Sequence, residues 1–192
     1  FASPENLAVN LAVELQLRGI INVFSTACAA GNYSIGRGFD LIQSGQQDFA
    51  LVGGADGFSR IIFNGFERLH AVAQETCRPF DKNRDGMIPA EGAGVLFFET
   101  IEHALARKAV IYAEVVGYGL SCDAHNMTIP SEPGVAKSIR QALRLSHGPA
   151  QEVDYFCAHG TGTKENDKTE SQAIRNVFGH LTEHVAVSSI KS

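Results

Sequence analysis

The sequence predicts an α/β fold in which strands alternate with helices. Short apolar runs such as residues 48–54 (DFALVGG) show no polar alternation, which is typical of strands buried in a parallel sheet. The segments between such runs have apolar residues at helical spacing, and glycines such as Gly45 and Gly179 close them. This alternation indicates βα units and a mostly parallel sheet.

Local signals place each element along the chain. Ser3 as N-cap, Pro4 in the first turn and Glu5 near the positive end of the dipole predict a first helix, which ends at Gly19. Residues 56–91 are rich in Gly, Pro and charge and are predicted to be loop. The other predicted elements are, in order, a strand at 20–25, a helix ending at Gly45, strands at 48–54 and 92–99, a helix at 101–107, a strand at 110–119, a helix at 134–145, a strand at 154–158, a helix at 166–178 and a strand at 185–189.

The composition argues against several classes of function. Hydrophobic residues make up 44% of the chain and charged residues 19%, which is enough apolar material for a packed core. The net charge is −5 and Lys and Arg form no cluster, so we expect no nucleic-acid binding and no membrane attachment. The sequence contains no signal peptide and no motif of nucleotide-binding proteins, serine hydrolases or zinc proteases. We expect a cytoplasmic protein.

The cysteines and one acidic segment give no sign of a metal site. The four cysteines, Cys28, Cys77, Cys122 and Cys157, form no zinc-binding spacing, so we expect free thiols in a reducing compartment. Residues 81–86 (DKNRDG) begin like a calcium-binding EF-hand loop, but its twelfth position is Gly92 instead of an acid. We therefore predict no metal, and a surface turn at 81–86.

Cys28 is the first candidate for chemistry, because it lies where a predicted strand passes into a predicted helix. Its neighbours are small, from Thr26 to Gly31, so that a substrate could approach the sulfur. The positive end of the following helix favours the thiolate, the form that attacks acyl groups. On position alone, a cysteine packed in the core as a small apolar residue is the commoner case, and both interpretations stay open here.

His159 is the second candidate, at the end of the predicted strand 154–158 in the sequence H-G-T-G-T. Ligands of open α/β sheets bind at the carboxyl ends of strands, where Cys28 is also predicted to lie. The glycines let a ligand approach the backbone, and the imidazole suits a general base or a hydrogen-bond donor. The hydroxyls of Thr161 and Thr163 could bond a polar ligand arm. A structural histidine in a tight turn is the commoner alternative.

Two acids follow on the next predicted helix. Asp167 and Glu170 share one face of its first turn, where acids usually complement the helix dipole. We interpret Asp167 in this way. For Glu170 a second interpretation is open, because Lys191 at the end of the last predicted strand could reach it.

Six segments in order resemble the β-ketoacyl-[acyl carrier protein] synthase family, and the resemblance covers nearly the whole chain. The segments are STAC (25–28), VGGAD (52–56), RPFD to EGAG (78–94), DAHNMT (123–128), HGTGT (159–163) and SSIKS (188–192). The resemblance implies a thiolase-like fold with αβαβα layers, here incomplete. Residues 1–105 would be the remainder of the N-terminal half, and residues 106–192 the start of the C-terminal half.

The resemblance also implies the activity of a 3-oxoacyl-[acyl-carrier-protein] synthase, an acyltransferase of fatty-acid or polyketide synthesis. An acyl group on Cys28 would be condensed with a malonyl group that loses CO2, and His159 would hydrogen-bond the malonyl thioester. The implied site residues are Cys28, His159 and Lys191 as catalytic, Glu170 and Asp167 as supporting, and Thr161, Thr163 and Phe63 as substrate-binding.

The implied partners are acyl carrier protein, which brings malonyl and acyl groups on its phosphopantetheine, and a second copy in a homodimer. No cofactor is expected. Phe63 lies in a stretch that aligns with the acyl tunnel of the family, where its ring would fill volume and favour short or medium acyl groups. Phe63 is equally typical of an interface core.

The chain departs from the family in two respects. In the family, the second catalytic histidine and the glycine-rich oxyanion loop follow the lysine that corresponds to Lys191. In this sequence only Ser192 follows Lys191, so neither feature is present. We therefore expect an internal piece of a longer protein, inactive on its own. Two other functions stay open: a catalytically silent partner subunit of the chain-length-factor kind, and another acyltransferase of the thiolase superfamily.

Overall fold

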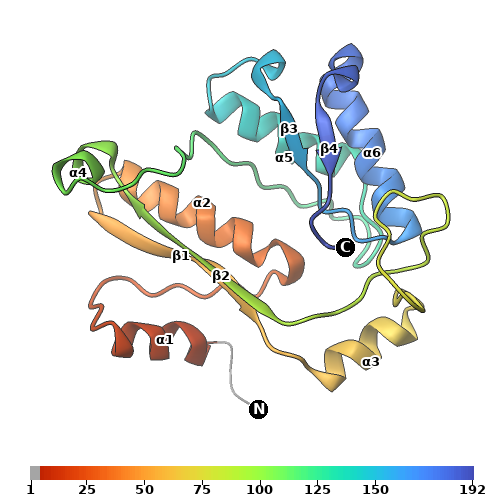
Figure 1. The fold of residues 1–192 in the computed structure, drawn as a ribbon, viewed down its shortest axis with the longest axis horizontal. Coiled ribbons are helices and arrows are strands. Elements are labelled where there is room, and N and C mark those ends of the chain that lie inside the picture. Colours follow the sequence, from red (N-terminus) through yellow and green to blue (C-terminus); the bar gives the residue numbers. More distant parts are fainter. Residues whose placement is uncertain (1–4) are drawn as a thin grey trace. The chain divides into compact units, whose positions relative to one another are not determined.

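The computed structural model describes residues 5–192, which divide into two compact units (Figure 1). Unit 1 contains the described residues as far as Gly57 together with Glu91–Val116, and unit 2 contains Phe58–Ala90 and Gly117–Ser192. The predicted N-cap Ser3 and the predicted first-turn Pro4 lie outside the described residues.

Unit 1 is built on two strands and the helix that follows Cys28. β1 (Phe49–Asp56) pairs antiparallel with β2 (Gly92–Glu99) along the full length of both strands. α2 (Ala30–Gln43) lies along this pair in Figure 1. At Gly38 the helix approaches β1 so closely that a Cβ atom would lie 2.3 Å from Cγ1 of Val52. The Ser34 hydroxyl also accepts a 3.0 Å hydrogen bond from the backbone of Gly53, so α2 is fixed on β1.

The remaining helices of unit 1 are short. α1 (Glu5–Glu14) ends before the predicted stop at Gly19, because Gln16 takes a left-handed conformation with φ of 54° and turns the chain. α4 (Ile101–Ala106) begins where predicted. Its N-cap is Thr100, whose hydroxyl accepts a hydrogen bond from the backbone of His103.

Unit 2 packs two helices against a parallel pair of strands. β3 (Tyr155–Cys157) pairs with β4 (Ala186–Ser188), and α5 (Glu132–Leu145) and α6 (Lys164–Phe178) enclose the core. The rings of Phe156 and Phe178 meet edge to face, with centroids 6.3 Å apart. The core consists of Ile174, Phe178 and Val185, with Ile139, Leu143, Ala150, Val153, Phe156, Val177 and Leu181 packed against them.

The prediction of a mostly parallel sheet holds for β3 and β4 but is wrong for β1 and β2. A parallel pair needs a crossover that returns to the same end of the sheet, whereas the long excursion between β1 and β2 brings the chain back antiparallel. This excursion was predicted to be loop, but it contains α3 (Arg60–Arg68). Ser59 caps α3 by accepting a hydrogen bond from the backbone of Ile62.

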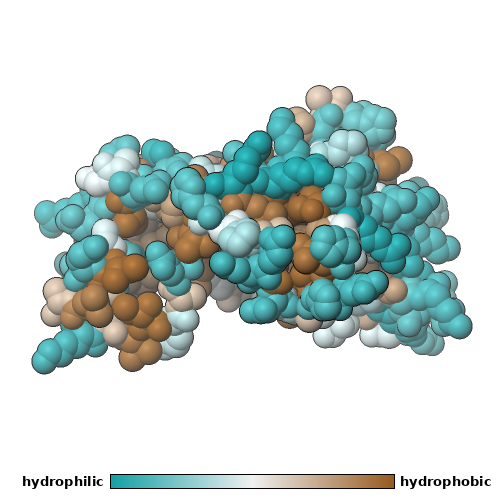
Figure 2. All heavy atoms as spheres, turned by 90° about the horizontal axis from the view of Figure 1, so that it is seen from above, coloured by the Kyte–Doolittle hydropathy of each residue, from teal (hydrophilic) through white to brown (hydrophobic). Residues whose placement is uncertain are grey.

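Two predicted strands do not pair with any strand in the described chain. Residues 20–25 and 110–119 have no regular secondary structure, and many of their side chains are exposed, with Val110 at 76% and Tyr112 at 96%. Their apolar composition predicts burial beside a partner strand, and residues 5–192 supply none. Large apolar side chains are therefore left at the surface, and Figure 2 shows such brown patches among the polar atoms. No helix described here is long and apolar enough to cross a bilayer.

Candidate functional site

Cys28 occupies a tight turn in unit 1. It is the central residue of the 3-10 turn η1 (Ala27–Ala29), directly before α2, and its thiol is free and exposed. Ala27 has φ of 50°, in the left-handed region that residues with a Cβ atom seldom adopt. Strained backbone of this kind is concentrated at functional sites. The turn places Cys28 at the amino end of α2.

His159 follows β3 in unit 2, and its side chain is partly buried. Burial lowers the pKa of the His159 imidazole below its ordinary value, and the nearby positive charge of Lys191 lowers it further. The carboxylates of Glu170 and Asp167 oppose this shift without reversing it. The lowered pKa favours the neutral form of the ring.

Lys191 determines which ring nitrogen of His159 carries the proton. Its ammonium nitrogen lies 3.3 Å from Nδ1 of His159 and also donates to the His159 backbone carbonyl. An ammonium group can only donate, so Nδ1 accepts and the proton lies on Nε2. The predicted reach of Lys191 to Glu170 is not observed, since the ion pairs found within residues 5–192 do not join them.

Glu170 holds the backbone of His159 from the other side. Its carboxylate is buried and accepts hydrogen bonds from the backbone N–H groups of His159, at 2.7 Å, and Gly160, at 2.9 Å. Lys191 and Glu170 thus bind the carbonyl and the N–H of the same residue. Both act on the position of His159 without contacting each other.

The turn after His159 is held by contacts with Ser189 and between its own two threonines. Gly160 has φ of 38°, and a Cβ atom there would lie 2.5 Å from Cβ of Ser189, so a larger residue does not fit. Ser189 donates a hydrogen bond to the Gly160 carbonyl. The hydroxyl oxygens of Thr161 and Thr163 lie 2.8 Å apart. Thr161 is buried and its hydroxyl oxygen also accepts the backbone N–H of Thr163, whereas Thr163 is partly exposed, so the Thr163 hydroxyl has more capacity left for a ligand.

Asp167 lies in the first turn of α6, as predicted, and it does more than complement the helix dipole. Its side chain is 1% exposed, and its oxygens accept hydrogen bonds from the backbone of Phe80, at 2.7 Å, and of Gly162, at 3.2 Å. The guanidinium of Arg84 lies 3.4 Å away and balances the buried charge. Asp167 therefore joins α6, the turn after His159 and the loop that precedes β2.

Sequence reasoning missed Arg84 and Cys77. The turn prediction at 81–86 is confirmed where Asp81 accepts a hydrogen bond from the backbone of Asn83, but the Arg84 side chain is largely covered instead of solvated. The Cys77 thiol is buried and contacts the Thr161 carbonyl at 3.4 Å, and burial raises its pKa. No spacing rule links these residues to His159, since only the folded loop brings them to it.

The acyl-tunnel candidate Phe63 lies on α3. Its side chain is partly buried, and its ring packs against that of Phe58 with centroids 6.1 Å apart. The neighbouring Ile61 and Ile62 are exposed. α3 therefore presents an apolar surface around Phe63.

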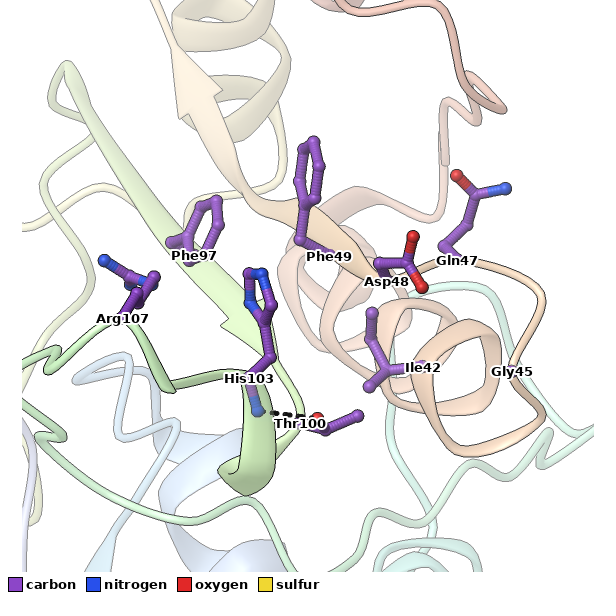
Figure 3. Close-up of a pocket in the computed structure, with 9 residues that line it drawn as sticks. All are labelled: Ile42, Gly45, Gln47, Asp48, Phe49, Phe97, Thr100, His103 and Arg107. Atoms are coloured by element: carbon purple, nitrogen blue, oxygen red, sulfur yellow. Dashed lines mark hydrogen bonds between the residues drawn. The ribbon is translucent and has the colours of Figure 1, made fainter. Parts of the chain in front are cut away.

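A pocket of about 650 Å³ in unit 1 lies at the other end of α2 from Cys28 (Figure 3). At about 1.5 Å per residue, the length of α2 separates the two by roughly 20 Å. The Glu99 carboxylate binds Arg107 and His103, which lower its pKa to about 2, and Arg107 also lies over the Phe97 ring. These charged groups satisfy one another, so they strengthen the end of β2 and are not left free for a ligand.

Two family descriptions together match almost the whole chain. "Beta-ketoacyl synthase, N-terminal domain" matches residues 2–104, and "Beta-ketoacyl synthase, C-terminal domain" matches residues 112–192. Nodulation protein E of Rhizobium sp. (strain N33) is 41% identical over 192 residues, which are 100% of this chain and 48% of that protein. The 3-oxoacyl-[acyl-carrier-protein] synthase 2 of Synechocystis sp. is 40% identical over 97% of this chain and 47% of its own length. The chain thus spans about half the length of these curated relatives.

Solved structures share the fold. The ishigamide ketosynthase/chain length factor matches with a TM-score of 0.95 and 47% identity, covering 98% of this chain and 47% of the other. A type II polyketide acyl carrier protein in complex with its ketosynthase (AntDE:AntF) matches with a TM-score of 0.91 and 34% identity, over 96% of this chain and 48% of that one. The predicted thiolase-like α/β fold is therefore confirmed, and the chain belongs to the β-ketoacyl synthase family.

Proposed function

We propose that the protein to which this chain belongs is a β-ketoacyl-[acyl carrier protein] synthase that catalyses a decarboxylative Claisen condensation. The observation that carries this proposal is the environment of His159: Nδ1 lies 3.3 Å from the Lys191 ammonium nitrogen, and burial and Lys191 together lower the pKa of the ring, which favours a neutral imidazole with its proton on Nε2. A fixed, neutral N–H donor is suited to stabilising an enolate oxygen as its charge develops. The exposed Cys28 at the start of α2 adds the nucleophile.

The reaction proceeds in two stages. The Cys28 thiolate attacks an acyl thioester of the carrier protein, its sulfur bonds the acyl carbon, and the carrier thiolate leaves and takes up a proton. Malonyl-carrier protein then loses CO2, and the electron pair of the broken carbon–carbon bond forms an enolate whose oxygen accepts the His159 Nε2–H. The enolate carbon attacks the acyl carbon on Cys28. The thiolate is released, and a carrier-bound 3-oxoacyl chain is formed without any cofactor.

The substrate arm meets the turn after His159. In this proposal Thr161 and Thr163 hydrogen-bond the amides of the carrier's phosphopantetheine, and Lys191, Glu170 and Asp167 position the turn. The complex of a related ketosynthase with an acyl carrier protein supports this choice of partner. The relatives include a 3-oxoacyl-carrier-protein synthase and polyketide ketosynthases, so the substrate belongs to fatty-acid or polyketide synthesis.

The proposed enzyme is a homodimer of chains that each contain two similar halves. Residues 1–105 end the first half and residues 106–192 begin the second, a division supported by family matches that end at residue 104 and resume at residue 112. Completion of the site requires the rest of the protein. The 192-residue segment alone is therefore expected to give no condensation or malonyl decarboxylation above background, and clear turnover by it would refute this part of the proposal.

The proposal is tested on the full-length protein. Incubation with acyl-carrier protein should add one acyl group to Cys28, detected by intact mass, and malonyl-carrier protein should then yield a 3-oxoacyl product. Cys28→Ala should abolish both, whereas Cys122→Ala, which removes another exposed thiol, should change neither. A full-length protein that accepts no acyl group at Cys28 would overturn the proposal and favour a silent partner of the chain-length-factor kind.

Phe63 is proposed to limit the acyl chain. Its ring fills space beside Phe58 on α3, so Phe63→Ala in the full-length enzyme should raise turnover of long acyl primers relative to short ones. Phe66→Ala, which shortens another partly buried ring of α3, is the control. An unchanged ratio of long to short primers in Phe63→Ala would assign Phe63 to an interface core.

A further inference from the structure

We infer that Arg84 is a positioning residue for the turn that carries Thr161 and Thr163, and that it sets how tightly this turn binds the malonyl-carrier arm. The expected effect on binding of the malonyl-carrier arm rests on the proposed function. Its structural basis is a set of contacts within unit 2 that join the loop before β2 to the start of α6.

Arg84 binds the turn directly through two backbone carbonyls. Its Nε donates to the carbonyl of Thr163 at 3.3 Å, and one terminal nitrogen donates to that of Lys164 at 3.0 Å. The other terminal nitrogen donates to the Asp81 carbonyl at 3.0 Å. The guanidinium is thereby fixed between its own loop and the last residue of the turn.

Arg84 also acts through Asp167. The Asp167 carboxylate is almost fully buried, 3.4 Å from Nε of Arg84, and accepts the backbone N–H of Gly162 between the two threonines. A buried carboxylate that loses its cation is left with an uncompensated charge, which is strongly destabilising. Movement of Asp167 towards water would weaken the bond to Gly162 and release the middle of the turn.

The planar, forked arrangement of the N–H donors of the guanidinium is as important as its charge. Arg84 serves three backbone carbonyls and a carboxylate from one plane, and a lysine ammonium at the end of a flexible stem cannot reproduce this geometry. Lysine at this position would keep the charge that balances Asp167 but lose the grip on Thr163. The two functions of Arg84 can therefore be separated by substitution.

The experiment compares Arg84→Met, Arg84→Lys and Lys82→Met in the full-length protein. Lys82 is an exposed cation of the same loop, so its substitution controls for loss of charge. The readouts are KM and kcat for decarboxylation of malonyl-carrier protein, the rate of Cys28 alkylation by iodoacetamide, and hydrogen exchange of the Gly162 amide. Iodoacetamide carries no pantetheine arm and reports Cys28 independently of the turn.

Arg84→Met should raise KM by about tenfold or more, the equivalent of losing one charge-assisted hydrogen bond, and should change kcat less. Cys28 alkylation should stay unchanged, Gly162 exchange should accelerate, and Arg84→Lys should restore exchange more fully than KM. An unchanged KM and unchanged Gly162 exchange in Arg84→Met, or an equal KM effect in Lys82→Met, would overturn the inference.

The inference and the proposed function fail differently. A wild-type protein without turnover defeats the proposed function, while Gly162 exchange in Arg84→Met still decides whether Arg84 holds the turn. If Arg84→Met does not fold, Arg84→Lys gives the decisive KM, because it retains the charge beside Asp167 and loses the fork.

Discussion

His159 is influenced by charges of both signs. The desolvation of its ring and the Lys191 ammonium lower its pKa, while Glu170 and Asp167 raise it. The balance favours the neutral form, in which the proton lies on the nitrogen away from Lys191. In the proposed reaction this is the form that donates to the enolate, so residue-scale electrostatics determine the pH range of activity.

Replacing Lys191 with methionine should raise the pKa of His159, because one of the two influences that lower it is removed. The acidic limb of kcat for malonyl decarboxylation should then move to higher pH in the full-length enzyme. Lys168→Met removes a positive charge from an exposed position on α6 and should leave the profile in place. An acidic limb at the wild-type pH in Lys191→Met would show that Lys191 does not set the pKa of His159.

Replacing Glu170 with glutamine should cost about 1–3 kcal/mol of folding stability. The two oxygens of Glu170 accept the N–H groups of His159 and Gly160, and an amide offers only one oxygen, so one buried donor would lose its partner. Urea unfolding of the full-length protein measures the change. Glu165→Gln, an exposed acid of the same helix, should shift the midpoint little, and equal shifts in both variants would contradict this account.

At the scale of elements, the junction of β2 and α4 depends on one carboxylate. Glu99 ends β2 and binds Arg107 just after α4, while Thr100 caps the helix between them. The folded pKa of Glu99 is about 2, below its ordinary value of 4.5. This pair therefore stabilises the fold above pH 4.5, and its contribution is lost as the pH falls towards 2.

Arg107→Met should accordingly lower stability at neutral pH and weaken the dependence of stability on pH between 4.5 and 2. Urea midpoints of the full-length protein at a series of pH values give the measurement. Arg18→Met removes an exposed cation from the same unit and should preserve the wild-type slope. A slope unchanged by Arg107→Met would mean that Glu99 titrates without reference to Arg107.

The elements that could be predicted from the sequence are those whose signals are local. The helix after Cys28, the short helix from Ile101 and the helix that ends at Gly179 have caps or apolar spacing within their own residues. α3 was missed because its capping Ser59 lies in a stretch rich in glycine and charge. Strand direction was missed for β1 and β2, since pairing is set by the path of the intervening chain.

The site could be predicted only in part for a similar reason. Cys28 and His159 stand in motifs that can be read from adjacent residues, and Lys191 ends another. The roles of Asp167 and Arg84 depend on contacts between residues about eighty positions apart, which the charge pattern of either segment does not reveal. Acids in a first helical turn and arginines between aspartates are ordinarily solvated, and here burial reverses that expectation.

At the scale of the whole molecule, exposed apolar segments mark where the chain lacks neighbours. Residues 20–25 and 110–119 pair with no strand in the part of the chain described, and side chains such as Val110 and Tyr112 are open to solvent. Apolar surface of this kind is usually covered by other protein. The relatives, about twice as long, have further chain that could cover it.

Hydrogen exchange should detect this covering. Amides of residues 110–116 should exchange rapidly in the 192-residue segment and at least tenfold more slowly in the full-length protein, where a neighbouring strand would bind them. The paired strands Phe49–Asp56 and Gly92–Glu99 serve as controls, since they should be protected in both. Rapid exchange of residues 110–116 in the full-length protein would rule out a strand partner there.

Two of the contacts that hold residue 159 are made with its main chain. The Glu170 carboxylate accepts a hydrogen bond from the backbone N–H of residue 159, and the Lys191 ammonium donates one to its carbonyl oxygen. Neither of these bonds requires an imidazole. Asparagine or glutamine at residue 159 would keep the backbone groups that make these two bonds. In the proposed enzyme, a single codon change at this position would therefore remove the imidazole and leave both main-chain bonds in place, which is a simple route to subunits that keep the architecture and abandon the reaction.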